Sequence, residues 1–136
     1  MLFILVDIIR KGCNKRMNEI LLETHGLTKQ FRRYKAVNDI DMHIRRGAIY
    51  GFIGRNGAGK TTFLKMVCGL ANPTAGEYSI FGCTGKELAQ VRPRVGCLIE
   101  APGIYANMTA RDNLMIKARL FGIRDKKYAD WILDTV

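Results

Sequence analysis

The stretch GRNGAGKTT, residues 54–62, holds the side chains and turns most able to do chemistry in this chain. It matches the pattern GxxxxGK[ST] at every defined position, and glycines at 57 and 59 let successive backbone N–H groups point inward. Such a nest binds anions, and the first turn of a following helix adds unpaired N–H donors. Lys60 offers an ammonium group to phosphates, and the Thr61 hydroxyl suits Mg²⁺. The stretch is therefore predicted to hold the polyphosphate of a nucleotide.

Two elements must flank this loop if it is to work. Residues 48–54, AIYGFIG, form a short apolar run and predict a strand buried on both faces. Residues 60–70 predict an amphipathic helix, because apolar side chains recur there at i, i+3, i+4 and i+7. These side chains are Phe63, Met66, Val67 and Leu70. Strand, glycine-rich turn and helix, in that order, are the context that the motif requires.

Strands and helices also alternate along the rest of the chain, which predicts the α/β class. In the expected strand 37–44, Ile40, Met42 and Ile44 share one face, and polar residues alternate on the other. Further strands are expected at 18–31 (with a break at Gly26), 78–82 and 95–100, and helices at 84–92, from Thr109 to about 121 and from Asp125 onward.

The sequence predicts an N-terminal cap and an apolar stripe in the last two helices. Thr109 and Asp112 fit a capping box. The expected apolar stripes are Leu114, Ala118 and Phe121 in the first of them, and Ala129, Ile132, Leu133 and Val136 in the second.

Composition limits the protein class. With 48% apolar and 25% charged residues, the 136-residue chain suits one globular domain rather than wholesale disorder. The net charge of +10 indicates either an anionic partner or a solvated basic surface. No run of five like charges occurs, so we favour the solvated surface and expect no nucleic acid. The four cysteines lack metal-ligand spacing, and reduced thiols in a cytosolic protein are the favoured interpretation.

The first 16 residues differ in character from the rest of the chain. Their opening apolar run, MLFILVDII, is shorter than the roughly 20 residues of a membrane helix and lacks the flanks of a signal peptide. We expect residues 1–16 to be a non-native or disordered N-terminal extension and Met17 to be the native start.

The loop resembles the Walker A motif of ABC-transporter ATPases, whose usual form is G-x-N-G-A-G-K-[ST]-T, and the likeness extends over residues 18–136. The resemblance implies an incomplete P-loop NTPase of the ABC ATPase type. It would contain the antiparallel β portion, the start of the parallel core sheet and the start of the helical subdomain. Residues 17–136 are then the N-terminal portion of that domain, with the P-loop core to about 104 and the helical subdomain from about 107.

The resemblance also implies which residues bind ATP. LTKQF followed by KAVNDI is similar to the family's strand with an adenine-stacking aromatic, so Phe31 is the expected ring and Tyr34 its rival. Stacking needs only a flat face, which phenylalanine provides as well as tyrosine. Val37 is expected to line the same pocket. The expected phosphate-binding residues are Gly54, Arg55, Asn56, Gly57, Ala58, Gly59, Lys60, Thr61 and Thr62.

A second segment, VGCLIEAPGIYANMTARDNL, resembles the family's Q-loop and places Glu100 where glutamine is usual. LIEAPG is typical of the branch that serves bacitracin and lantibiotic export or immunity. The resemblance implies catalytic roles for Lys60 and Glu100, and it implies that Thr61 and Glu100 hold Mg²⁺. A carboxylate suits this hard cation, although it adds negative charge beside the γ-phosphate.

The family needs further motifs for hydrolysis. A Walker B aspartate followed by glutamate, a switch histidine and an LSGGQ signature are not found in residues 100–136, and Asp134 lies in a helical pattern. We therefore expect ATP binding without appreciable turnover and poor stability of the chain alone. The alternatives are a non-catalytic nucleotide-binding fragment and another P-loop NTPase or kinase.

The resemblance finally implies partners and location. In the intact family the partners are membrane-spanning permease subunits and a second ATPase subunit. The expected location is cytoplasmic, peripheral on the cytoplasmic face of the plasma membrane through the permease.

Overall fold

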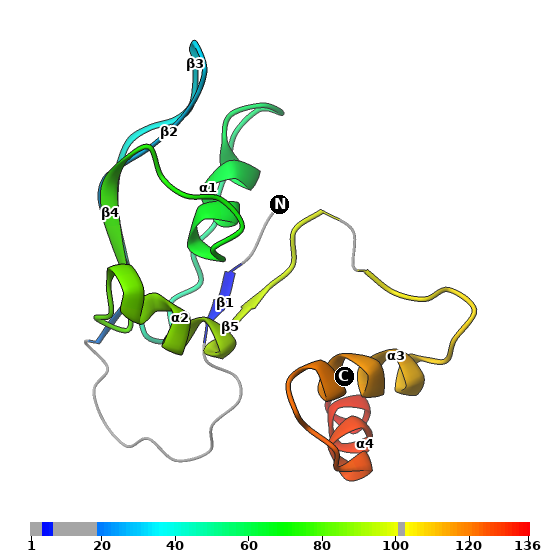
Figure 1. The fold of residues 1–136 in the computed structure, drawn as a ribbon. Helices are drawn as coiled ribbons and strands as arrows, with labels where there is room; N and C mark the ends of the chain where they lie inside the picture. The colour runs from blue at the N-terminus through cyan, green and yellow to red at the C-terminus, as the bar shows by residue number, and fades with distance from the viewer. Residues whose placement is uncertain (1–3, 7–18, 101–102) are drawn as a thin grey trace. The chain divides into compact units, whose positions relative to one another are not determined.

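The computed structural model describes residues 4–6, 19–100 and 103–136, which fall into two compact units, Met1–Ala101 and Pro102–Val136 (Figure 1). The strands of the first unit are β1 (Ile4–Val6), β2 (Ile20–Phe31), β3 (Tyr34–Arg45), β4 (Ala75–Ile80) and β5 (Val95–Cys97). Its helices are α1 (Lys60–Val67) and α2 (Leu88–Val91), with 3-10 turns at Gly85–Glu87 and Arg92–Arg94. The second unit contains α3 (Ala110–Leu120) and α4 (Lys126–Thr135). Strands and helices that alternate from β3 to β5 agree with the predicted α/β class. The strand pairs of the described ranges are all antiparallel, so the expected start of a parallel core sheet is not formed there.

A three-stranded antiparallel sheet in the order β3-β2-β4 forms most of the first unit. The predicted strand at 37–44 is confirmed and extends further at its N-terminal end. Its alternation is confirmed at the end of the strand, where Ile44 is buried and Met42 half-buried while Asp41 and His43 are exposed. Ile40, which we expected on the same inward face, is exposed, because it follows Asp39 at φ +55°, where the regular period of the strand is interrupted. One face of this strand therefore meets the core, and the other meets water.

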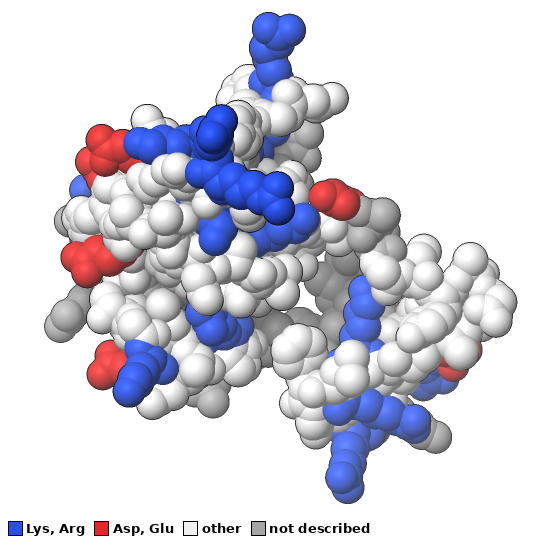
Figure 2. Space-filling view, turned by 45° about the horizontal axis from the view of Figure 1, so that its top comes forward, with Lys and Arg blue, Asp and Glu red and all other residues white. Residues whose placement is uncertain are grey.

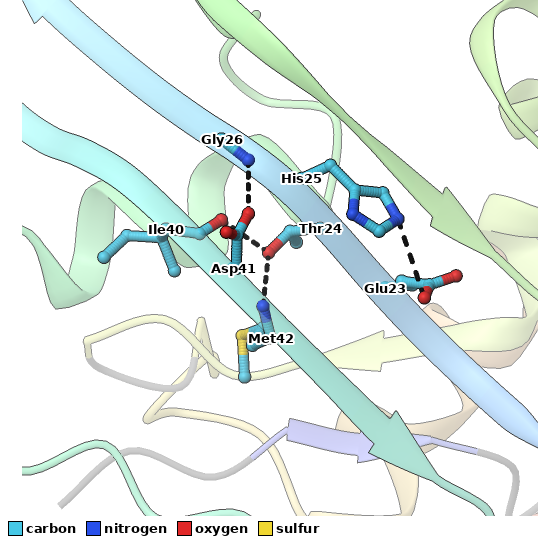
Figure 3. Close-up of polar contacts among 7 residues, drawn as sticks. All are labelled: Glu23, Thr24, His25, Gly26, Ile40, Asp41 and Met42. Atoms are coloured by element: carbon cyan, nitrogen blue, oxygen red, sulfur yellow. Dashed lines mark hydrogen bonds and ion pairs between the residues drawn. The ribbon is translucent and has the colours of Figure 1, made fainter.

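The break predicted at Gly26 is a bulge rather than an end of the strand. Gly26 has φ +56°, and the pairing of β2 with β3 shifts register at this point. Figure 3 shows the polar contacts that hold the bulge. The buried Thr24 hydroxyl donates to the Ile40 carbonyl at 2.8 Å and accepts from the Met42 N–H at 3.1 Å, and the Gly26 N–H donates to the Asp41 carboxylate. The hairpin thus stays paired across the bulge.

The core of the first unit lies between this sheet and the helices α1 and α2. An eight-residue helix is too short to be stable alone, so α1 depends on this packing. The clustered core residues are Leu22, Leu27, Val37, Ile44, Phe63, Leu64, Met66, Val67, Tyr78, Ile80, Leu88 and Val91.

The prediction of a fully buried strand at 48–54 is wrong for this structure. The segment forms no named strand, and Ile49 and Ile53 are almost fully exposed. Only Phe52 packs on the core, with its ring centroid 5.0 Å from that of Phe63. A strand buried on both faces needs neighbours on both edges, and this segment has a single isolated bridge, at Phe52, and no pairing with a named strand of the described ranges.

The predicted apolar stripe of the first helix is correct at three positions and wrong at the fourth. Phe63, Met66 and Val67 are buried, but Leu70 is 72% exposed. The helix ends before it because Gly69 adopts φ +75°, which returns the chain so that the Leu70 N–H donates to the Lys65 carbonyl. Past that turn the helical period no longer applies.

The segment 84–97 is less regular than predicted. The helix expected at 84–92 is the single turn α2 between two 3-10 turns, the second of which contains Pro93. The strand expected at 95–100 is shortened to β5, which pairs antiparallel with β1. β1 belongs to the segment 1–16 that we expected to be non-native or disordered, and the rest of that segment and Met17 lie outside the described residues.

The second unit confirms both predicted helix starts. The Thr109 hydroxyl accepts from the Asp112 N–H at 3.1 Å, and the Asp125 carboxylate accepts from the Lys127 N–H at 2.9 Å. None of the helices in the described ranges combines the length and the apolar surface needed to cross a bilayer.

Two predicted members of the apolar stripes are misplaced in this unit. Ala118 and Ala129 are buried as expected, but Phe121 and Val136 are exposed. Both lie just beyond the last helical residue, where the spacing that placed them inward has ended.

Candidate functional site

A hollow of about 500 Å³ joins the tip of the β2–β3 hairpin to the glycine-rich loop. The hairpin contributes Phe31, Tyr34 and Ala36, and the loop with the first turn of α1 contributes residues 56–62. Two aromatic side chains and the glycine-rich loop therefore border the same space.

The Lys60 ammonium lies inside the curl of its own loop. Its Nζ donates to the Gly54 carbonyl at 2.6 Å and to the Arg55 carbonyl at 2.8 Å. The Ala58 N–H also donates to the Arg55 carbonyl, at 3.1 Å. Gly54 and Arg55 do not line the hollow, so their observed part is to hold the loop through their carbonyl groups.

The start of α1 is open to an anion. Its N-cap is Gly59, with φ +86°, and no side chain caps the first turn or adds negative charge there. The N–H groups of the first helical residues have no partner within the helix, and the positive end of the helix dipole adds to them. Thr61 and Thr62 border the hollow at this point.

Gly59 is required for the loop to approach the hairpin. A Cβ at this position would lie 2.0 Å from the Ala36 carbonyl oxygen and 3.3 Å from the Val37 side chain. The buried Val37 does not line the hollow, although we expected it to; it supports the loop from the core side.

The two candidate stacking rings have different surroundings. Phe31 is half exposed, with the Lys29 ammonium 5.1 Å from its ring centroid. Tyr34 is also exposed, and its hydroxyl donates to the Gly57 carbonyl at 3.0 Å. Both rings line the hollow, so both remain candidates for stacking. The contacts of Tyr34 and Ala36 with the loop were not foreseen from the sequence.

Glu100 does not line the hollow. It has φ +64°, and its carboxylate lies 3.9 Å from the Lys65 ammonium on α1. The structure therefore does not bring Glu100 and the Thr61 hydroxyl together as ligands of one cation. Within the described ranges, His, Cys, Asp and Glu form no cluster of three or more that could hold a metal ion.

The charge around the hollow favours an anion. Its lining includes Lys60 and no carboxylate. Figure 2 shows Lys and Arg side chains in several separate groups on the face in view, with fewer acidic ones. An anionic ligand would thus meet positive potential without competing acidic groups at the loop.

Cys68, directly after α1, is half-buried, and its thiol is not suited to act as a nucleophile. Burial, together with a hydrogen bond to Cys97, raises the pKa of the Cys68 thiol to about 12. It therefore stays protonated at neutral pH.

Comparisons with known proteins point in one direction. The family model described as ABC transporter matches residues 37–136. Bacitracin transport ATP-binding protein BcrA of Bacillus licheniformis is 44% identical over 117 residues, which cover 85% of this chain and 38% of the relative. Lantibiotic transport ATP-binding protein SrtF of Streptococcus pyogenes is 34% identical over 77% of this chain and 45% of the relative. A solved ATP binding subunit of an ABC transporter superposes with a TM-score of 0.60 at 28% identity, over 79% of this chain and 45% of that one. The chain thus spans less than half the length of these relatives.

Proposed function

The chain belongs to the ABC transporter family, and we propose that its glycine-rich loop binds the phosphates of ATP with Mg²⁺. The main observation in support of this proposal is the hollow that the loop, the start of α1 and two aromatic rings line together. Its volume lies within the range typical of small-ligand pockets.

The loop supplies three kinds of phosphate contact. Left-handed glycines at 57 and 59 curl the backbone as an anion nest requires, the start of α1 adds N–H groups, and Lys60 adds a full positive charge. Lys60 already sits in the curl, so binding requires it to exchange the Gly54 and Arg55 carbonyls for phosphate oxygens. The Thr61 hydroxyl is the group that would hold Mg²⁺, which when bound shields phosphate charge.

The biological setting is part of the same proposal. The names of two relatives refer to bacitracin and lantibiotic transport. We propose that this chain is the N-terminal part of an ATP-binding subunit for antimicrobial-peptide export or immunity. It would work with permease subunits and a second ATPase subunit at the cytoplasmic face of the plasma membrane. Glu100 would then join the site as a metal ligand once the nucleotide is bound.

Replacing Lys60 by alanine is expected to weaken ATP binding by about 10- to 100-fold, because charge-assisted hydrogen bonds to phosphate are lost. The measurement is titration with a fluorescent ATP analogue, with and without Mg²⁺. Lys86→Ala is the matched control, since it removes the same charge from the first unit but lies outside the hollow. Equal loss in both variants would mean that net charge, not the loop, attracts the nucleotide.

We also propose that the chain binds ATP without appreciable hydrolysis. Support comes from the lining of the hollow, which within the described residues offers no carboxylate to activate water. Phosphate release by the purified chain should equal that of Lys60→Ala. Turnover that Lys60→Ala abolishes would contradict this proposal and favour a complete catalytic site.

A further inference from the structure

We propose that Tyr34 is a positioning residue of the phosphate loop, which its hydroxyl holds in the binding form through the Gly57 carbonyl. The contact is a hydrogen bond of 3.0 Å between segments 23 residues apart in the chain. The inference rests on the proposed function, since it assigns to Tyr34 a part in the same site that is separate from stacking.

The strand and the loop meet at matched positions. Tyr34 and Ala36 are two residues apart on β3, and both line the hollow. Gly57 and Gly59 are likewise two residues apart on the loop. Tyr34 contacts the Gly57 carbonyl, and the Ala36 carbonyl lies against the Cα of Gly59. One end of β3 therefore supports the loop at two successive glycines.

The two supports differ in kind. Gly59 is fixed by packing, because any side chain there would collide with the strand backbone. Gly57 has φ +84°, and a Cβ built on it would meet nothing within 4 Å. No neighbour restrains this turn on its Cβ side, so the hydrogen bonds to its peptide take on that task.

Those hydrogen bonds fix one peptide unit at both ends. The Gly57 carbonyl accepts from Tyr34, and the Ala58 N–H of the same peptide donates to the Arg55 carbonyl at 3.1 Å. A rigid, planar peptide that is held at both its oxygen and its nitrogen cannot flip. The neighbouring amides then keep the inward direction that a phosphate needs.

This contact separates the tasks of the two rings. The Tyr34 hydroxyl is engaged with the loop, whereas the Phe31 ring has the Lys29 ammonium 5.1 Å from its centroid and is half exposed. Phe31 is then the flat surface on which the base stacks, and Tyr34 fixes the phosphate loop relative to the hairpin.

The test uses Tyr34→Phe, which removes the hydroxyl and keeps the ring, with ATP and inorganic tripolyphosphate as probes. We expect both ligands to bind about two- to tenfold more weakly, by the same factor, because one hydrogen bond that orders the loop is lost. Phe31→Leu should weaken ATP alone. Tyr105→Phe in the second unit is the matched control and should change neither.

A ligand-free readout accompanies the titrations. Hydrogen exchange at the Ala58 amide should be faster in Tyr34→Phe than in the wild type and unchanged in Tyr105→Phe. Unchanged exchange together with unchanged tripolyphosphate affinity would overturn the inference, as would a loss confined to ATP, which indicates stacking. If the wild type binds neither probe, the proposed function fails, and the exchange rates alone decide the role of Tyr34.

Discussion

Replacing Gly59 by alanine is expected to destabilise the first unit by about 2–5 kcal/mol and to abolish nucleotide binding. The left-handed conformation at φ +86° costs an alanine about 1–2 kcal/mol. The added methyl would also sit 2.0 Å from the Ala36 carbonyl oxygen, so the loop or β3 must shift, at about 1–3 kcal/mol more. Urea unfolding followed by circular dichroism measures the first effect, and ATP-analogue titration measures the second.

Gly57→Ala is the matched comparison for this variant. Gly57 has nearly the same φ, +84°, but its added methyl meets nothing within 4 Å. It should therefore show only the conformational cost of about 1–2 kcal/mol. Equal destabilisation by the two substitutions would mean that Gly59 does not rest against β3, and that the loop is held by its turns alone.

The local features of the fold were predictable from the sequence because neighbours in the chain decide them. Thr109 and Asp125 cap helices through residues two or three positions away, and the alternation from Asp41 to Ile44 in β3 follows from the period of a strand. The segment 48–54 differs, because its burial depends on strands that must pair with it. Its apolar composition indicates what it can bury but not whether the partners are present.

The candidate site also contains features that the sequence predicts and a contact that it does not. The pattern at 54–62 predicts the glycine turns and the lysine, since the chemistry of phosphate binding fixes those residue types. The contact from Tyr34 to Gly57 joins a hairpin tip to a backbone carbonyl, and any residue type supplies that carbonyl. The acceptor of this hydrogen bond does not require a particular residue type, so the sequence does not indicate the contact and the structure is needed to show it.

Two leucines six positions apart provide the second large prediction. Leu64 is fully buried in α1, whereas Leu70, which we predicted on the same stripe as the buried residues of that helix, is 72% exposed beyond the Gly69 turn. Leu64→Ala should lower the free energy of unfolding by about 2–5 kcal/mol, because it removes core contacts and leaves a cavity. Leu70→Ala should change it by less than about 0.5 kcal/mol.

The pair also tests how the site is supported. α1 carries Lys60 and Thr61 at its start, and its eight residues keep their helical form through the core side chains that include Leu64. Leu64→Ala should therefore weaken ATP-analogue binding in step with stability, although Leu64 does not line the hollow. Leu70→Ala should leave both unchanged. A comparable loss of stability in Leu70→Ala would show that the helix continues past Gly69 and buries Leu70, as the sequence pattern alone suggests.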